Sequence, residues 1–257
     1  MSKETIIVLV LIVVAFFGGY YFSKNENGSK VPALENQPTT AIQAVDTTVT
    51  MDKVKALFND EKNLVFGNKD SKLLFVIVSD PSCPYCHAAA GKNSKLSKDM
   101  GERFVLKSDG GTYVAPEVEM KKLVDSGKAG MVWMYANGHG AGELATEAMY
   151  CANEQGKFWE VHDKFMSFEG YGIMNESIGN DRTKIAALVE FIGKTADSGK
   201  LKSCLDSGKY TSRISENMAT AKQIGFEGTP YYLINTTRFV GAYNYTEMQA
   251  AVDEALK

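Results

Sequence analysis

Two short runs of apolar residues stand out in the chain after Thr50, each with turn or polar residues on both sides. The first covers residues 73–78 (LLFVIV) and the second covers residues 131–135 (MVWMY). Strands that are buried on both faces of a sheet have such continuous apolar runs, whereas half-buried strands alternate apolar and polar positions. The pattern therefore predicts two central strands.

Helical spacing of apolar residues follows each of these runs. Residues 116–124 are expected to form a helix that ends at Gly127, because glycine favours the left-handed conformation that closes helices. From about residue 143 to residue 224 apolar side chains recur every three or four positions, for example at Phe158 and Val161. This period is typical of helices that bury one face.

A hairpin and a last helix are predicted near the end of the chain. The hairpin pairs the stretches at residues 231–234 and 238–240 across a polar turn. Thr246 and Gln249, three residues apart, fit a capping box at the start of the last helix. The order strand, helix, strand, helical block, hairpin, helix predicts an α/β fold with a helical insertion at about residues 141–224.

The first fifty residues differ from the rest in composition. Residues 5–22 are apolar without a charge, and a helix of that length spans close to the ~30 Å hydrocarbon core of a bilayer. We interpret residues 1–23 as a transmembrane anchor. Residues 24–50 are polar and aperiodic, which predicts a flexible stalk. Residues 51–257 are the predicted folded domain. A cleaved signal peptide and a buried core helix are the alternatives, although signal peptides usually have a shorter apolar region.

The orientation of this anchor follows from the short tail ahead of it. Lys3 lies on one side of the apolar stretch, and Lys24 and Lys30 lie on the other. The positive-inside rule therefore hardly decides which end of the anchor is cytoplasmic. A tail of a few residues favours a cytoplasmic N-terminus. We therefore expect a single-pass membrane protein whose folded domain lies on the extracytoplasmic side, periplasmic or external.

Composition and charge narrow the classes of function. The 257 residues are 44% hydrophobic and 23% charged, which is typical of globular proteins and not of disordered chains. The formal net charge of −3 gives no basic field for nucleic acid, and we expect no nucleic-acid partner. Four cysteines are too few for a small scaffold held together by disulfides, so each cysteine can be considered separately.

Two of the cysteines form a Cys-x-x-Cys motif just after the first predicted strand. Residues 83–87 read Cys-Pro-Tyr-Cys-His, and Pro84 suits the first turn of a helix. A sulfur at that place meets unpaired N–H groups and the positive end of the helix dipole, which both favour a thiolate. In such motifs the pKa of the first cysteine falls to about 3.5–7.5. Cys83 is therefore the predicted reactive sulfur, and Cys86 the partner that closes the disulfide.

Two metal-based interpretations of this motif compete with the redox interpretation. Cys-x-x-Cys-His is also the signature of c-type haem attachment, although a buried strand leads directly into the motif and Pro84 lies inside it. As a residue that follows a redox motif, His87 is expected on the helix surface. A zinc site needs two more close ligands, and the sequence has no second Cys-x-x-Cys. We expect no metal and no cofactor other than the redox-active disulfide.

Several motifs together resemble the DsbA-like branch of the thioredoxin superfamily. They are Cys83-Pro84-Tyr85-Cys86 after an apolar strand, Gly228-Thr229-Pro230 before the hairpin, and the stretches at residues 64–68, 150–159 and 204–210. The resemblance covers about residues 63–257. It implies a thioredoxin fold with a helical insertion, in which Pro230 is a cis proline beside the active site and Pro84, Tyr85 and Thr229 support the cysteines.

The resemblance also implies an activity and its partners. We expect an extracytoplasmic thiol–disulfide oxidoreductase that donates disulfides to exported proteins with free thiols and is reoxidised by a membrane partner. The alternatives are an isomerase or reductase of the same fold, or a thioredoxin-like binding module without catalysis. Similar sequences often carry a cysteine pair like Cys151 and Cys204, which implies a structural disulfide; two buried free thiols are the alternative.

Two features depart from the family pattern. Thioredoxin has a buried acid six residues before its first active-site cysteine, and Ile77 occupies that position here. Asp80 is the nearest acid, so proton transfer by a buried carboxylate at this place is doubtful. The segment at about residues 91–111 is longer and more polar than the compact first helix of the family. It is either a solvated excursion or a lip that binds a partner.

Overall fold

The computed structural model describes residues 48–257, so the predicted anchor and most of the predicted stalk lie outside the described residues. Within residues 48–257 no helix is long and apolar enough to cross a membrane. The strands are β1 (Leu64–Gly67), β2 (Leu73–Ser79), β3 (Ala129–Tyr135), β4 (Tyr231–Ile234) and β5 (Thr237–Val240). The α-helices are α2 (Met51–Asn59), α3 (Pro84–Ala90), α4 (Ser94–Asp99), α5 (Pro116–Asp125), α6 (Glu143–Asn153), α7 (Phe158–Phe165), α8 (Phe168–Gly172), α9 (Ile185–Ile192), α10 (Ser198–Asp206), α11 (Thr211–Gln223) and α12 (Tyr245–Leu256). Short turns of 3₁₀ or π-helix connect them: η1 (Glu102–Phe104), η2 (Lys107–Asp109), η3 (Ile173–Ser177), η4 (Arg182–Lys184) and η5 (Gly193–Thr195).

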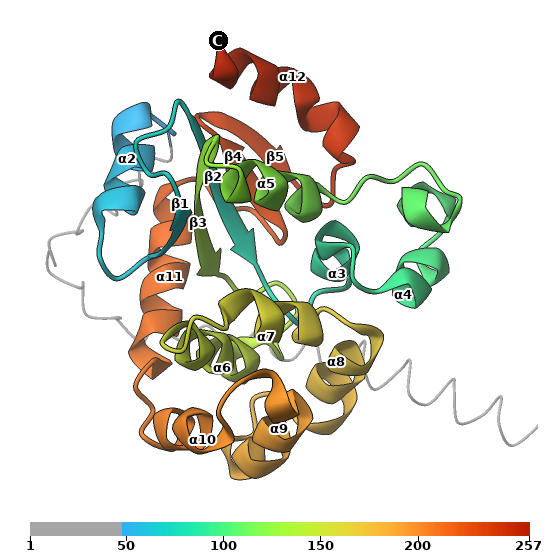
Figure 1. The fold of residues 1–257 in the computed structure, drawn as a ribbon, viewed down its shortest axis with the longest axis vertical. Coiled ribbons are helices and arrows are strands. Elements are labelled where there is room, and N and C mark those ends of the chain that lie inside the picture. Colours follow the sequence, from blue (N-terminus) through green and yellow to red (C-terminus); the bar gives the residue numbers. More distant parts are fainter. Residues whose placement is uncertain (1–47) are drawn as a thin grey trace, which may run out of the picture. The chain divides into compact units, whose positions relative to one another are not determined.

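A five-stranded sheet with the order β1-β3-β2-β4-β5 forms the centre of the described domain (Figure 1). β2 pairs in parallel with β3 and antiparallel with β4, and the edge strands β1 and β5 are both antiparallel to their neighbours. Every residue of β2 and of β3 is buried. The two continuous apolar runs of the sequence are therefore the two central strands, as predicted.

Alternate residues of β2 contribute to two separate hydrophobic clusters. Phe75 and Ile77 belong to the larger cluster, which includes residues of α3, α5, α12 and the helical block. Val76 and Val78 belong to the smaller cluster, which includes residues of α2 and α11. Because side chains of a strand point alternately to its two faces, helices must cover both faces of the sheet. Figure 1 shows α2 and α11 on one side and α5 and α12 on the other.

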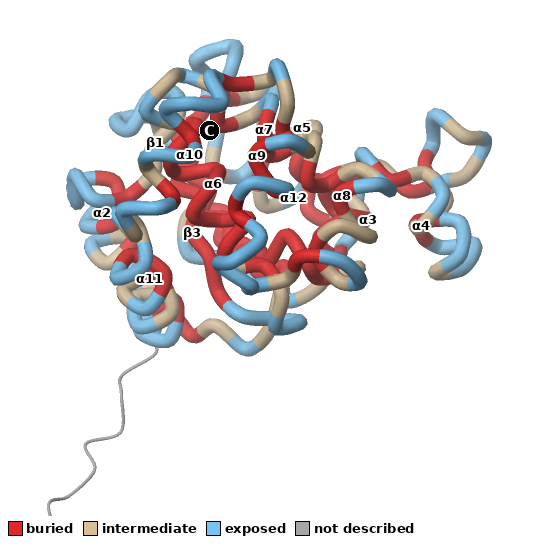
Figure 2. The backbone as a smooth tube through the Cα atoms, turned by 90° about the horizontal axis from the view of Figure 1, so that it is seen from below, coloured by how far each residue is buried: buried red, intermediate tan, exposed pale blue. Residues whose placement is uncertain are grey.

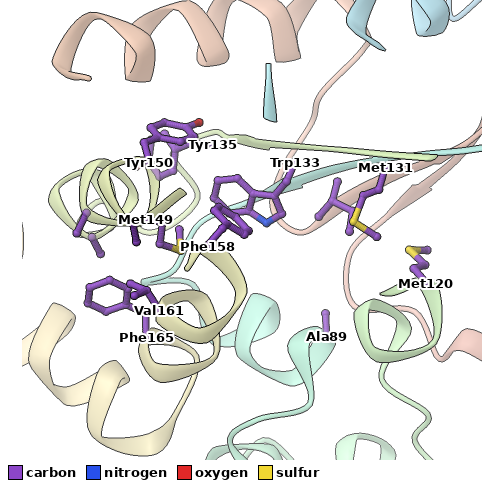
Figure 3. Packing of buried hydrophobic residues seen from close by; sticks show 14 of the residues in the cluster. Ala89, Met120, Met131, Trp133, Tyr135, Met149, Tyr150, Phe158, Val161 and Phe165 are labelled. Carbon is purple, nitrogen blue, oxygen red and sulfur yellow. The ribbon is translucent and has the colours of Figure 1, made fainter. Parts of the chain in front are cut away.

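The helices α6 to α11 form an insertion between β3 and β4. α6 to α10 gather at one end of the sheet, whereas α11 runs alongside the sheet (Figure 1). Trp133 of β3 is fully buried, and its ring lies 5.4 Å from that of Phe158 and 6.4 Å from that of Tyr150, in edge-to-face arrangements. Figure 3 shows Trp133 beside Phe158 in this cluster. Aromatic packing of this kind joins the sheet to the insertion.

The last helix begins two positions before the predicted start. Asn244 is its N-cap, and the capping box joins Asn244 to Glu247, not Thr246 to Gln249 as predicted. The Asn244 side chain also accepts a hydrogen bond from Val114 N (3.2 Å) and donates one to Thr112 O (2.9 Å). The start of α12 is thus fixed by contacts with a distant segment.

Residues 91–114, here called the excursion, connect the end of α3 to the start of α5. They contain α4, η1 and η2, and Figure 2 shows the segment around α4 standing out from the side of the domain. Phe104, Leu106 and Tyr113 of the excursion are nevertheless buried in the larger hydrophobic cluster. Of the two alternatives for this segment, a merely solvated excursion does not fit these three side chains, which anchor it; a lip that binds a partner stays a prediction.

Cys151 of α6 and Cys204 of α10 form a disulfide across a sequence separation of 53. We predict that replacing both cysteines by alanine lowers the free energy of unfolding by about 4 kcal/mol, because the unfolded chain regains the freedom of a long closed loop. Urea unfolding of the oxidised protein and of the double variant measures this difference. A loss below about 1 kcal/mol would show that the bridge contributes little to stability.

Candidate active site

Cys83 and Cys86 lie where β2 ends and α3 begins. Residues 80–82 form the turn, in which Cys83 N donates a hydrogen bond to Asp80 O (2.9 Å). Cys83 is the N-cap residue of α3, and Pro84 occupies its first turn. Both sulfurs are free thiols. Cys83 is 4% exposed and Cys86 is fully buried, so Cys83 is the more accessible of the two.

The pKa of Cys83 is lowered to about 6. The largest cause is a hydrogen bond from the Cys86 thiol; the Thr229 hydroxyl and the backbone N–H groups of Cys86 and Tyr85 add smaller contributions, while burial acts in the opposite direction. From the sequence alone, the low pKa of Cys83 was expected to come from the start of the helix. At neutral pH the Cys83 sulfur is therefore mostly a thiolate.

Cys86 has the opposite electrostatic environment. Burial raises the pKa of its thiol well above the ordinary value, and the neighbouring Cys83 raises it further. Its Sγ accepts a hydrogen bond from Asp80 N (3.4 Å). Cys86 thus keeps its proton, which it donates in a hydrogen bond to the Cys83 thiolate.

The loop before β4 approaches Cys83 from the other side. The Thr229–Pro230 peptide bond is cis, and when protonated the Cys83 thiol donates to Thr229 O (3.6 Å). Within the described part of the chain the Thr229 hydroxyl has no other hydrogen-bond partner, so it is available to the Cys83 thiolate. A Cβ on Gly138 would overlap the Thr229 side chain, which explains the glycine at that position.

Asp80 is fully buried and accepts four hydrogen bonds. Ser82 donates its backbone N–H (2.8 Å) and its hydroxyl (2.7 Å) to Oδ1. The backbone N–H groups of Gly138 (2.9 Å) and His139 (2.8 Å) donate to Oδ2. The sequence identified Asp80 only as the nearest acid; in the structure its carboxylate ties the active-site turn to the loop after β3.

His87 is fully buried, and the prediction of a surface residue is wrong. One ring nitrogen lies 2.7 Å from Pro81 O and the other lies 3.0 Å from Met166 O. Burial lowers the pKa of His87 to about 4, so the ring is neutral. The ring links the active-site turn to the helical insertion. A neutral ring carries one N–H, so one nitrogen donates and the other accepts; Asn93 Nδ2 lies 3.3 Å from Nδ1 and can donate to it.

α5 contributes a buried carboxylate, Glu117, which contacts the residue that pairs with Ile77 in the sheet. Tyr232 pairs with Ile77 in the sheet, and its hydroxyl donates to Glu117 Oε1 (3.2 Å). His162 Nε2 lies 3.4 Å from Glu117 Oε2. Burial opposes a charge on His162, but the carboxylates of Asp163 and Glu117 raise the pKa of its ring above the usual value. No sequence motif indicated this cluster.

A groove with a volume of about 460 Å³ borders the active site. Its lining includes Tyr85, Arg103, Phe104, Thr229, Val240 and Tyr243. Tyr85, from the Cys-x-x-Cys motif, is 49% exposed, and its ring lies 5.7 Å from that of Phe104. Sequence reasoning missed Arg103 and Phe104, because only the fold brings the excursion to the motif.

The sequence matches the family model described as thioredoxin over residues 115–254. The matched part begins after the excursion and includes Thr229 and Pro230. A protein of Rickettsia conorii that is provisionally named a protein-disulfide oxidoreductase is 24% identical and covers 88% of this chain and 69% of its own length. The chain also spans about a quarter of the length (25%) of a Na⁺/H⁺ antiporter of Salinispora tropica, to which it is 24% identical.

Solved structures share the fold. BdbD from Bacillus subtilis, in its oxidised form, aligns with a TM-score of 0.55 at 17% identity, over 76% of this chain and 94% of that one. The thiol-disulfide exchange protein alpha-DsbA2 from Wolbachia pipientis aligns with a TM-score of 0.52 at 20% identity, over 82% of this chain and 98% of that one. The chain thus belongs to the thioredoxin family.

Proposed function

We propose that the chain is a thiol–disulfide oxidoreductase that donates a Cys83–Cys86 disulfide to exported proteins with free thiols. The opposite pKa shifts of the two cysteines carry this proposal, with Cys83 lowered to about 6 and Cys86 raised. The disulfide-exchange names of the Rickettsia and Wolbachia proteins support it. An isomerase or a reductase of the same fold is the second candidate, because isomerases also have a threonine before the cis proline, as Thr229 stands before Pro230 here.

The first step attacks the more accessible sulfur. A substrate thiolate attacks Cys83 Sγ of the oxidised pair, because Cys83 lies at the start of α3 and is the more accessible of the two residues in the dithiol form. A bond forms between the substrate sulfur and Cys83, the Cys83–Cys86 bond breaks, and Cys86 leaves. Because the pKa of Cys86 is raised, this sulfur takes up a proton and remains a thiol.

The second step releases the product. A second substrate thiolate attacks the substrate sulfur of the mixed disulfide, and Cys83 leaves as a thiolate. Two electrons have then passed from the substrate to the cysteine pair. A thiol of lower pKa leaves faster, and each pKa unit corresponds to ~1.4 kcal/mol of preference for the thiolate. The donors around Cys83 therefore favour transfer of the disulfide to the substrate.

The proposed cycle needs an oxidant and a location. A membrane partner would reoxidise the pair by accepting its two electrons, and the apolar residues 5–22 would hold the domain at the membrane, on the extracytoplasmic side. Disulfides form and persist in such oxidising compartments. The Cys151–Cys204 disulfide is consistent with that location.

We predict that alkylation of Cys83 in the reduced protein by iodoacetamide follows an apparent pKa near 6. The rate should be high above pH 7 and fall as the pH drops through 6, because only the thiolate reacts. Cys86→Ala should raise this pKa by about one to two units, since a hydrogen bond to a charged group contributes about 1.5–3 kcal/mol. Thr229→Val should raise it less. A larger effect of Thr229→Val would contradict the assignment of Cys86 as the main donor.

We predict that the reduction potential of the Cys83–Cys86 pair, measured against glutathione, is more positive than that of thioredoxin, about −270 mV. The reason is that a pKa of about 6 for Cys83 lies below the value of about 7 in thioredoxin, so the reduced form is more stable. The oxidised protein should also introduce disulfides into a reduced unfolded protein. A potential at or below about −270 mV would favour the reductase.

We predict that the full-length chain stays with the membrane after alkaline carbonate extraction, because residues 5–22 have no charge. Protease added from the extracytoplasmic side should digest the folded domain. N-terminal sequencing of the mature protein provides the decisive comparison. A mature chain that begins after Phe22 would replace the anchor with a cleaved signal peptide.

A further inference from the structure

The lining of the groove beside the active site comes from distant parts of the chain. Arg103 and Phe104 come from the excursion, and Val240 and Tyr243 come from the end of β5 and the turn after it. Val240, Tyr243 and Tyr85 are exposed although they are large and hydrophobic. Exposed apolar side chains that gather beside a reactive group indicate a binding surface. A polypeptide whose cysteine reaches Cys83 would place its flanking residues in this groove.

Two charged side chains line the groove, and they differ in their partners. Glu247 accepts a hydrogen bond from Asn244 N (2.8 Å) as part of the capping box of α12. The Arg103 guanidinium lies over the Phe104 ring, 4.9 Å from its centroid, and Arg103 is exposed. Among residues 48–257 it has no carboxylate partner. Glu247 brings the opposite charge to the groove but its carboxylate is held in the capping box, so the Arg103 guanidinium is the cation that is available to a carboxylate entering the groove.

The other basic residues of the excursion do not share this position. Lys92 pairs with Asp163 (2.5 Å) and Lys98 pairs with Asp109 (3.4 Å). The Lys95 ammonium lies 4.0 Å from the centre of the Phe168 ring. Lys107 is exposed but is absent from the groove lining. The positive charge that the excursion contributes to the groove lining thus comes from Arg103.

We propose that Arg103 determines specificity by favouring substrates that carry a carboxylate close to the reacting cysteine. This inference rests on the proposed thiol–disulfide exchange and names a substrate class for it: cysteine-containing polypeptide segments with an acidic residue beside the cysteine and apolar residues around it. The apolar side chains of the groove bind the segment, and the Arg103 guanidinium favours segments that carry a negative charge. Complementary charge at the edge of an interface acts mainly on specificity and on the association rate.

The test uses two dithiol peptides that differ only in a Glu or a Gln next to the first cysteine. Each peptide reduces the oxidised protein, and the second-order rate constants give a Glu/Gln ratio. Because the same two peptides are used with every variant, their intrinsic thiol reactivity cancels when ratios are compared. Arg103→Gln should lower the ratio about two- to five-fold, the range expected for an exposed ion pair, and Arg103→Lys should largely restore it.

Two controls separate this effect from a general loss of charge. Lys107→Gln removes an exposed cation of the excursion outside the groove and should leave the ratio unchanged. An ionic strength of about 1 M, where the screening length is about 3 Å, should reduce the wild-type ratio toward that of Arg103→Gln. An unchanged ratio in Arg103→Gln, or an equal change in Lys107→Gln, would overturn the inference and leave the exchange activity standing. If neither peptide reduced the oxidised wild-type protein, the proposed function itself would fail.

Discussion

A carboxylate that is buried away from water needs hydrogen-bond donors within the fold, and Asp80, which follows β2, accepts hydrogen bonds from four. Ser82 provides two of them and so shapes the turn into the cysteine motif. The backbone of Gly138 and His139 provides the other two and holds the loop after β3 against this turn. Gly138 in turn packs directly on Thr229 of the cis-proline loop, which the pairing of β4 with β2 also holds in place. One buried carboxylate thus joins the active-site turn to the loop that contacts Thr229.

Features that the sequence predicted correctly depend on local signals. The apolar runs of β2 and β3 show burial on both faces, and the spacing of apolar residues shows the helical block. The Cys-x-x-Cys motif is contiguous, so its residue types indicate its chemistry before any fold is known. The prediction of a low pKa for Cys83 was correct in direction, but its main cause, the thiol of Cys86, depends on how the two side chains are oriented.

Features that the sequence could not predict depend on contacts between distant segments. The buried ring of His87 contacts the carbonyl of Met166, 79 positions away, and nothing near His87 in the sequence indicates this contact. Glu117 is part of a regular helical pattern, yet Tyr232 and His162 enclose its carboxylate. Asn244 begins α12 because the excursion supplies further partners for its side chain. In each case tertiary packing overrides a local preference.

Tyr85 contributes both to the low pKa of Cys83 and to the lining of the groove. Its backbone N–H contributes to the low pKa of Cys83, while its ring packs edge-on against Phe104 of the excursion. Phe104 is buried, whereas Arg103 is exposed on the outer side of the same turn. A change at Phe104 would therefore move Tyr85 and disturb the thiolate, but a change at Arg103 alters the charge of the groove without removing a donor from Cys83. The excursion can thus vary at its exposed positions and change which segments bind, while the buried parts of the site keep the reactivity of the cysteine pair.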